Sequence, residues 1–412
     1  MGLLSPSGAW TLILRNVFAI SFLGCQNVCV KIIALASCQT VRNREPEATL
    51  MSEKKSENSV FRILDAAINR ASEGLRVVED YLRMDLADAH LAGTLKDLRH
   101  DLTEATKGVD PQQRMAARDS VGDVGRTIET AAEYDREPSD AAPAAQSVVQ
   151  PNLARAQQAL RTIEEFSKTL DTGIAKKVEQ LRYRVYTAEK AVLTTLISLK
   201  NLGDARLYVL VNACSGGATD ADEPFAQLQE LIKTLVDVNV DVIQLRDKTL
   251  NDRQLIDAGR AISKITRSSG TKFIMNDRVD LAMASNADGV HLGQDEMQIA
   301  DARRIMGAAR LIGISTHSIE QARQAVLSGA NYIGIGPVFP SQTKSFDSHV
   351  GLDLVSAVAK EIQLPAFAIG GINLENVQSV CDAGQSRVAV QNAITQAKNP
   401  GRAAGAFVKL LA

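Results

Sequence analysis

The feature that most constrains the fold is a regular alternation of short β-rich runs with amphipathic stretches, which begins after Asn201. The expected strands are residues 206–211, 241–246, 272–276, 289–293, 310–315, 332–338, 366–370 and 387–390. Each of the first seven precedes a stretch with helical periodicity, and a last helix is expected over 402–411. Strands that alternate with helices build parallel sheets, and eight such units in about 200 residues predict a compact α/β fold, a (β/α)8 barrel.

Polar residues and glycines gather where seven of these strands end. They are Gln244, Arg246 and Lys248; Asn276 and Asp277; His291, Asp295 and Glu296; Ser315 and His317; Ser341, Thr343 and Lys344; Gly370 and Gly371; and Gln391 and Asn392. Any one of them could be a solvated side chain or part of a turn. Because such barrels carry their chemistry at the carboxyl ends of the strands, the joint pattern predicts an active site there.

The residue types at these ends suit a phosphorylated substrate and a magnesium ion. Arg246 and Lys248 alternate along one strand, so their two positive charges point the same way, toward a phosphate or pyrophosphate. Asp277 and either Asp295 or Glu296 offer carboxylates from neighbouring strands, which are ligands that Mg²⁺ prefers. The two glycines after the seventh strand allow backbone N–H groups to approach an anion, at the usual phosphate site of this fold.

The preceding region, from about Ser59 to Leu199, has helical periodicity and repeats itself. Residues 70–81 and 155–166 share the frame R-A-x-x-x-L-R-x-x-E, followed by an acid and an aromatic residue, at an offset of 85 positions. Further on, Leu98-Arg99 recurs as Leu181-Arg182. The repeat predicts an all-α domain in which a duplicated helical hairpin packs as a pseudo-symmetric bundle.

The repeated charges have more than one explanation. The first copy carries Arg70, Arg76, Glu79 and Asp80, and the second carries Arg155, Arg161, Glu164 and Glu165. Residues three apart on a helix can pair on its surface. A pseudo-twofold site with arginines for phosphate and carboxylates for Mg²⁺ would also explain both copies, and so would descent from a duplication without any site. Residues 118–126 suit a ligand-covering loop or an ordinary turn, and residues 132–151 read as a flexible connection.

Composition sets further limits. The chain has 46 basic and 48 acidic residues and a formal net charge of −2, so no nucleic-acid partner is expected. Its longest apolar stretch without a charge, residues 16–30, is shorter than the ~20 residues of a membrane span. The five cysteines form no C-x-x-C pair, which favours a cytoplasmic protein. The expected domains are a disordered or untranslated leader over 1–50, a helical domain over 51–200 and the barrel over 201–412. A targeting segment is the alternative for the leader.

Six motifs, in order along residues 205–412, resemble those of thiamine phosphate synthase. They read Q-x-R-x-K, I-M-N-D, G-V-H-L-G-Q, G-I-S-T-H, G-P-V-F-P-S-x-T-K and A-I-G-G-I. The resemblance implies a transferase that joins hydroxymethylpyrimidine diphosphate to a thiazole phosphate, with release of pyrophosphate and formation of thiamine monophosphate. Both partners are small molecules, and one Mg²⁺ per barrel site is implied.

The resemblance also implies roles for individual residues. Gln244, Arg246, Lys248 and Asn276 would hold the pyrimidine diphosphate, Asp277 would bind Mg²⁺, Ser315 would contact the pyrophosphate or pyrimidine, Ser341, Thr343 and Gly371 would contact the thiazole phosphate, and Lys344 would reach the diphosphate. Two positions depart from the family pattern. Glu296 aligns with the second metal ligand, with Asp295 as its competitor, and Gln391-Asn392 replaces the usual small hydroxyl residue after the eighth strand.

The helical region resembles a domain that occurs fused to this synthase and that is proposed to be a hydroxymethylpyrimidine phosphate kinase. This resemblance implies ATP–Mg²⁺ binding, although the chain has no G-x-x-x-x-G-K-[ST] loop. The alternatives are a non-catalytic assembly module for the helical region and a thiazole tautomerase-like activity for the barrel. The intact Q-x-R-x-K motif, Asp277 and Thr343-Lys344 argue against the tautomerase. The oligomeric state stays open.

Overall fold

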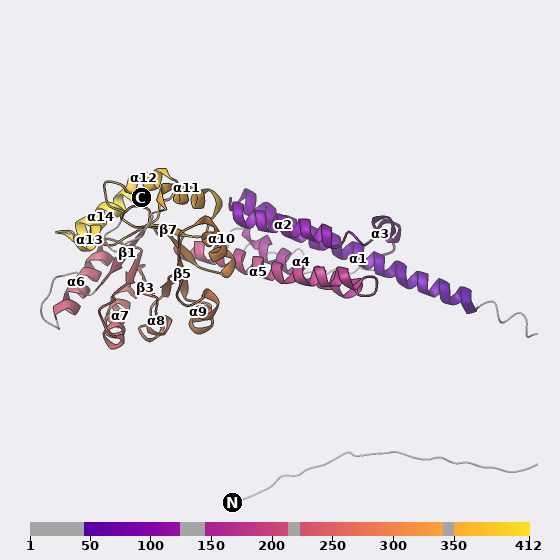
Figure 1. Cartoon of the computed structure of the whole chain (residues 1–412), viewed down its shortest axis with the longest axis horizontal. Coiled ribbons are helices and arrows are strands. Elements are labelled where there is room, and N and C mark those ends of the chain that lie inside the picture. Colours follow the sequence, from indigo (N-terminus) through magenta and orange to yellow (C-terminus); the bar gives the residue numbers. More distant parts are fainter. Residues whose placement is uncertain (1–44, 124–144, 213–222, 341–349) are drawn as a thin grey trace, which may run out of the picture. The chain divides into compact units, whose positions relative to one another are not determined.

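The computed structural model describes residues 45–123, 145–212, 223–340 and 350–412. Its unit from Asn58 to Ala412 contains a helical bundle followed by a barrel (Figure 1). Among the residues that the structure describes, none of the helices has the length and the hydrophobicity of a membrane-spanning segment.

Eight parallel strands close into a barrel in the order of the sequence, as the alternation predicted. The strands are β1 Leu207–Val211, β2 Val242–Leu245, β3 Lys272–Asn276, β4 Gly289–Leu292, β5 Leu311–Thr316, β6 Tyr332–Ile335, β7 Ala366–Ile369 and β8 Val388–Val390. The sheet closes where Tyr208 of β1 pairs with Ala389 of β8. Both ends of β3 lie where they were predicted, and no observed strand end differs from its prediction by more than three residues.

Helices surround the barrel. They are α6 Glu223–Asp237, α7 Asp252–Thr266, α8 Val279–Ala284, α9 Ile299–Met306, α10 Ile319–Ser328, α11 Gly351–Glu361, α12 Val377–Asp382, α13 Asn392–Thr395 and α14 Pro400–Leu411. Polar side chains at the N-caps explain where two of these helices begin. Asn251 caps α7 in a reciprocal pair with Gln254, and the Ser318 hydroxyl accepts from the N–H of Gln321 at the start of α10.

Alternate residues of the strands face the barrel interior, because successive side chains of a strand point to opposite faces. The inner cluster includes Tyr208, Val242, Ile274, Tyr332 and Phe367, all buried. The other face of the same strands packs against the surrounding helices. The inward positions nearest the carboxyl ends of the strands are therefore the ones that a ligand at that end can reach.

The bundle is built by α1 Glu45–Met84, α2 Ala89–Ala105, α4 Val149–Ser167 and α5 Thr172–Leu202, with the short helices α3 Pro111–Ala117 and η3 Gln146–Val148 between the two halves. Helix α4 begins inside the connection predicted over 132–151. Leucines and valines such as Leu64, Val78 and Leu160 line a fully buried core. Helices α1 and α4 approach closely at Gly74, where a Cβ would lie 2.8 Å from the carbonyl oxygen of Asn152.

Hydrogen bonds join the bundle to loops that precede barrel strands. One carboxylate oxygen of the fully buried Asp88 accepts from the N–H of Leu91 and so caps α2, and the other accepts from the N–H of Gln363, before β7. Ser198 of α5 bonds to the side chain of Asn331, before β6. Burial raises the pKa of the Asp88 carboxyl, although both N–H donors favour its charged form.

Candidate active site

A continuous chain of hydrogen bonds crosses the barrel interior and joins two residues that the sequence places in the site. Gln244 of β2 donates from Nε2 to the Tyr208 hydroxyl at 2.8 Å, and the hydroxyls of Tyr208 and Tyr332 lie 3.1 Å apart. His291 of β4 is 3.3 Å from the Tyr332 hydroxyl through Nδ1 and 3.0 Å from Ser315 Oγ through Nε2. The chain therefore links side chains of β2, β1, β6, β4 and β5.

The middle of this chain is held by two phenols that are closed to solvent. Tyr208 and Tyr332 are 3% and 1% exposed. Burial raises the pKa of both hydroxyl groups above the usual 10, so both stay protonated at neutral pH. Their rings also contact Phe367 edge-on. Because each neutral hydroxyl can donate and accept, the pair fixes the orientation of Gln244 on one side and of the His291 ring on the other.

Sequence reasoning missed Tyr208 and Tyr332. Tyr208 is the second residue of β1 and Tyr332 is the first residue of β6, so both lie in the barrel interior, away from the carboxyl ends where polar residues were expected. The signal that could have identified them is their position in the strand pairing, which directs both side chains into the barrel. Tyr208 lies two positions before Leu210, which pairs with Gln244, and Tyr332 pairs with Gly313, whose lack of a side chain leaves room for the ring.

Removal of one phenol hydroxyl tests this chain. In Tyr332→Phe, the hydroxyl of Tyr208 and Nδ1 of His291 each lose a buried partner, which destabilises the fold by about 1–3 kcal/mol. We expect the KM for a substrate bound against Gln244 to rise several-fold, with a smaller change in kcat, in steady-state assays of the barrel's reaction. Tyr183→Phe removes the hydroxyl of an exposed tyrosine on α5 and serves as the matched control. Equal KM values for both variants would show that the chain does not orient the site.

Asp277 occupies an unusual backbone position at the end of β3. Its φ of +58° lies in the left-handed region, which aspartate tolerates better than most residues and which often occurs at functional sites. Its N–H donates to the His291 carbonyl oxygen at 2.8 Å, and its Oδ2 accepts from Asn276 Nδ2 at 2.6 Å. The carboxylate is thus held at the strand end, beside the amide of its neighbour.

The carboxylates at this end of the barrel suit Mg²⁺ only in combination with a substrate. No group of three or more His, Cys, Asp or Glu residues in the described ranges could hold a metal by itself. Asp277, which is half-buried, and Glu296, which is exposed, offer two carboxylates after β3 and β4. This fits an ion that takes one or two carboxylates and completes its coordination with substrate phosphates and water.

The expected cationic and glycine positions also lie at the strand ends. Arg246, half-buried, follows β2 directly and donates its N–H to the Val211 carbonyl oxygen, while Lys248 is exposed two residues later. Gly371 has a φ of +64°, and a Cβ there would lie 2.5 Å from the Pro340 carbonyl oxygen. Glycine is therefore required at this position by both backbone conformation and space. Gln391 and Asn392, half-buried, follow β8 at the start of α13.

Three expected site residues, Ser341, Thr343 and Lys344, lie outside the described residues, and so does His349. The segment before them is described. Val338 and Phe339 donate their N–H groups to the carbonyl oxygens of Ile369 and Gly370. The stretch that precedes the serine is thus bound to the end of β7.

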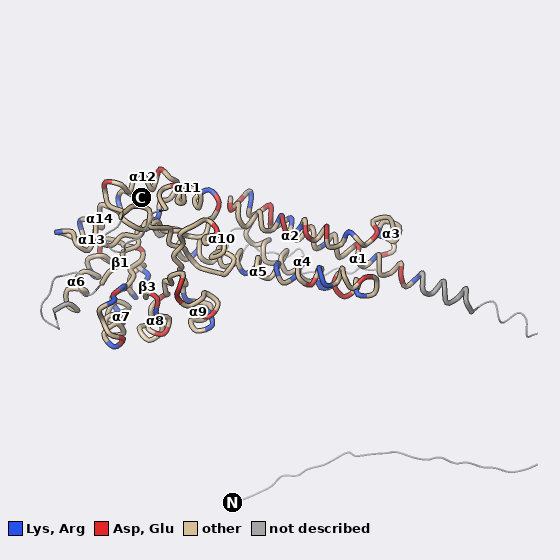
Figure 2. Tube along the Cα trace, viewed as in Figure 1, with Lys and Arg blue, Asp and Glu red and all other residues tan. Residues whose placement is uncertain are grey.

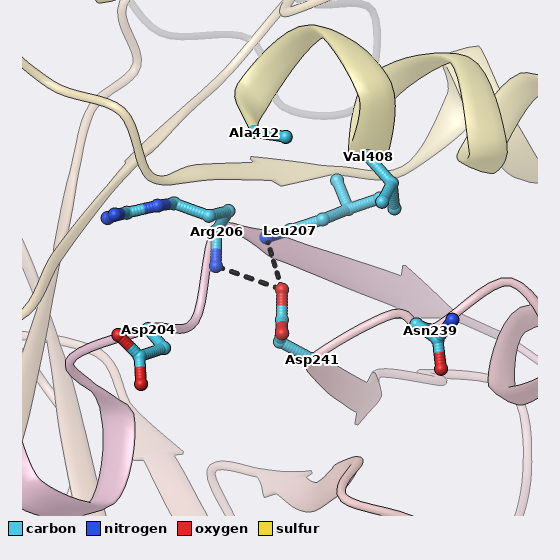
Figure 3. Close-up of a pocket in the computed structure, with 7 residues that line it drawn as sticks. All are labelled: Asp204, Arg206, Leu207, Asn239, Asp241, Val408 and Ala412. Atoms are coloured by element: carbon cyan, nitrogen blue, oxygen red, sulfur yellow. Dashed lines mark hydrogen bonds between the residues drawn. The ribbon is translucent and has the colours of Figure 1, made fainter.

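A cavity of about 320 Å³ lies at the other end of the strands (Figure 3). It is lined by residues before β1 and β2 and by the carboxyl-terminal helix. There the Asp241 carboxylate accepts from the N–H groups of Arg206 and Leu207, while the Arg206 guanidinium points away from it. These contacts satisfy the backbone where β1 begins, and the cavity contains none of the expected site residues.

The bundle's repeated acids form the same ion pair in both copies. Glu79 accepts from Arg99 at 3.0 Å, and Glu164 accepts from Arg182 at 2.8 Å. The two glutamates are 5% and 3% exposed. Each pair joins the two helices of its own hairpin, which gives a structural reason for the recurrence of Leu98-Arg99 as Leu181-Arg182.

The repeated Arg76 and Arg161 pair along their own helices. Arg76 Nε lies 3.1 Å from Asp80, and Arg161 Nη2 lies 2.6 Å from Glu165. The second copy has an extra feature, because the guanidinium of Arg182 also lies over the ring of Tyr183. Both positive and negative residues lie along the helices of the bundle (Figure 2).

Together, these features define a closed eight-stranded (β/α)8 barrel with a polar rim at the carboxyl ends of its strands, joined to a duplicated helical bundle. The family model "Thiamine monophosphate synthase" matches residues 217–394, and the "ThiD2 family" model matches residues 62–191. The thiamine-phosphate synthase of Rhodopirellula baltica is 44% identical over 346 residues, which cover 82% of this chain and 88% of that protein. The chain therefore belongs to the thiamine-phosphate synthase family.

Other similar proteins bear related names. The thiamine-phosphate synthase of Nostoc punctiforme is 40% identical over 341 residues, covering 83% of this chain and 91% of that protein. Among solved structures, a thiamine phosphate pyrophosphorylase from Pyrococcus furiosus is 30% identical, with a TM-score of 0.44, and covers 50% of this chain and 95% of that chain.

Proposed function

We propose that the barrel condenses 4-amino-2-methyl-5-hydroxymethylpyrimidine diphosphate with thiazole phosphate, giving thiamine monophosphate and pyrophosphate. The observation that carries this proposal is the set of amide, cationic and carboxylate side chains at the carboxyl ends of β2, β3 and β4, in a member of this family. The hydrogen-bond chain beneath the rim supports it, since a neutral, buried polar network suits an uncharged aromatic ring better than a second phosphate.

In this proposal each strand end has its own task. Gln244 and Asn276 hold the pyrimidine. Arg246, Lys248 and Lys344 neutralise the diphosphate as it leaves, and Ser315 contacts either the pyrimidine or the diphosphate. The thiazole phosphate is bound by the N–H of Gly371 together with Ser341 and Thr343, and Gln391 and Asn392 border it. The Ser315 hydroxyl lies 3.0 Å from His291 Nε2, and this hydrogen bond fixes the orientation of the hydroxyl group.

Asp277 and Glu296 would hold one Mg²⁺, which supplies positive charge to the oxygens of the departing diphosphate. Asn276 keeps the Asp277 carboxylate in place through its 2.6 Å hydrogen bond. The arginine and lysines stabilise the same oxygens from the protein side. Such stabilisation of developing charge by groups already in position is commonly the largest part of a rate enhancement.

The reaction proceeds by loss of pyrophosphate before the new bond forms. The C–O bond of the pyrimidine methylene breaks and both electrons leave with the diphosphate. The remaining cation is stabilised by the electron-rich aminopyrimidine ring, and the thiazole nitrogen then donates its lone pair to the methylene carbon. No protein nucleophile takes part, so the residues of the barrel bind, orient and neutralise charge.

For the helical domain over residues 51–200, we propose phosphorylation of hydroxymethylpyrimidine phosphate with ATP–Mg²⁺. The match of residues 62–191 to the ThiD2 family supports it. The full chain would then make the diphosphate that its barrel domain, residues 201–412, consumes. On the cysteine pattern we place both reactions in the cytoplasm.

The test uses the full chain with the pyrimidine monophosphate, thiazole phosphate, ATP and Mg²⁺, with thiamine monophosphate as the measured product. We expect product in this mixture and also when the pyrimidine diphosphate replaces the monophosphate and ATP. If product formed from the pyrimidine diphosphate but not from the monophosphate with ATP, the kinase would be refuted and the synthase would stand. Absence of product from the diphosphate would refute the synthase.

A further inference from the structure

The duplication keeps four charges in each copy, but the bundle's own ion pairs explain only three of them. Arg76 and Arg161, the glutamates after them and the next acids all have partners within the bundle. Arg70 and Arg155 differ. Both are exposed, and neither has a hydrogen bond or ion pair with any residue that the structure describes. Pairing within the bundle therefore gives no reason for an arginine at this position in both copies.

The packing of α1 against α4 places these two arginines near each other. Gly74 of α1 meets α4 between Asn152 and Ala156. Helices α1 and α5 both end beside loops of the barrel, where Asp88 bonds to Gln363 and the Gly203 carbonyl accepts from Arg387. Helix α4 forms a hairpin with α5, so it runs antiparallel to α5 and hence to α1. The pseudo-twofold axis that relates two antiparallel, equivalent helices is perpendicular to the plane that contains both helix axes. Rotation about this axis does not exchange the two faces of the pair, so equivalent residues lie on the same face.

Helical geometry then sets the distance. Arg70 precedes Gly74 by four residues, which is about 40° around the helix, and Arg155 precedes the equivalent Ala159 by four. Because Gly74 lies opposite residues 152–156, Arg70 and Arg155 are separated by three or four residues along the helix axes. At 1.5 Å of rise per residue, this separation is about 5 Å. The helix axes are about 8 Å apart at such a small-residue contact. Both guanidinium groups can therefore reach one point on the outer face of this pair.

Two guanidinium groups at one exposed point repel each other unless an anion lies between them. Glu73 is the acid nearest in sequence to Arg70, but it is exposed and forms no ion pair with either arginine. Its equivalent in the second copy is the neutral Gln158. A phosphate group offers several charged oxygens and can accept paired hydrogen bonds from two planar guanidinium groups at once.

We propose that Arg70 and Arg155 together bind a phosphate group of a phosphorylated substrate of the helical domain, across the pseudo-twofold axis of α1 and α4. This inference rests on the proposed kinase function, because it names the group that the domain's substrates share. The terminal phosphate of ATP and the phosphate of the pyrimidine monophosphate have the same chemistry here, and the experiment separates them.

The experiment measures binding to the full chain by titration calorimetry, with two probes used separately: a non-hydrolysable ATP analogue with Mg²⁺, and the pyrimidine monophosphate. The variants are Arg70→Ala, Arg155→Ala and the double variant. We expect each single variant to weaken binding of one probe at least tenfold and the double variant to weaken it further. Lys96→Ala, which removes an exposed and unpaired cation on α2 in the described part of the bundle, is the matched control.

A second readout separates a binding defect from misfolding. Condensation of supplied pyrimidine diphosphate by the barrel should proceed at the wild-type rate in all variants, and Arg70→Lys should retain more binding than Arg70→Ala. Loss confined to one probe identifies the source of the phosphate. Unchanged binding of both probes by the folded double variant would overturn the arginine site. A wild-type chain that binds neither probe and phosphorylates no pyrimidine would instead refute the kinase itself.

Discussion

Asp277→Asn is expected to abolish nearly all synthase turnover, by about 1000-fold or ~4 kcal/mol of transition-state stabilisation. Asparagine tolerates the left-handed backbone conformation at this position, so the loss would reflect the missing charge rather than strain. Asp277→Ala should lose as much turnover, with about 1 kcal/mol of additional backbone strain. The measurement is kcat/KM for the pyrimidine diphosphate over a range of Mg²⁺ concentrations.

Asp301→Ala is the control for this prediction, because Asp301 is a half-exposed aspartate of α9 that pairs with Arg304 on the surface. It should retain near-normal turnover. The G-P-V-F-P-S-x-T-K motif, which ends at Lys344, predicts that Lys344→Ala loses a large part of the synthase activity. If Asp277→Asn turned over normally, at every Mg²⁺ concentration, metal-assisted departure of the diphosphate would be wrong.

Gly313→Ala is expected to have the largest effect on stability. A Cβ at this inward position of β5 would overlap the phenol ring of Tyr332, which is fully enclosed and cannot move without displacing Tyr208 and Phe367. Overpacking of this kind destabilises by about 1–3 kcal/mol, and the broken hydrogen-bond chain adds about 1 kcal/mol or more. We expect a lower midpoint in urea denaturation and a KM for the pyrimidine diphosphate raised at least tenfold.

Gly405→Ala provides a contrast of opposite sign. Gly405 lies within α14, and a Cβ there meets no atom within 4 Å. Alanine in a helix is favoured over glycine by about 1 kcal/mol, so this variant should be more stable than the wild type and equally active. A Gly313→Ala protein as stable as Gly405→Ala would show that the barrel interior is not tightly packed around Tyr332.

The sequence was informative wherever the physical signal is local. The alternation of strand and helix patterns predicted the closed barrel, because each unit of a (β/α)8 fold repeats the same short-range pattern. The helical repeat likewise predicted a bundle of two hairpins, and both copies form the same glutamate–arginine pair. The connection before α4 was predicted too long, since weak propensities near a helix start leave its boundary uncertain.

The candidate site was less accessible to such reasoning. Asp277, Arg246 and Gly371 were sought because they end strands, and the structure places them there; their roles in binding remain predictions. Tyr208 and Tyr332 were not sought, since an inward aromatic residue within a strand looks like any core residue. Only the hydrogen bonds to Gln244 and His291 distinguish them.

By itself, the sequence determined the order of the elements, the end of the barrel at which polar groups collect, and the duplication of the bundle, because these follow from periodicity along the chain. The tertiary structure alone decided which distant residues meet. Tyr208 and Tyr332 are 124 positions apart and touch because barrel closure brings β1 and β6 across the same interior. The same is true of Gly74 and Asn152, since helix packing selects partners by shape and space rather than by position in the chain.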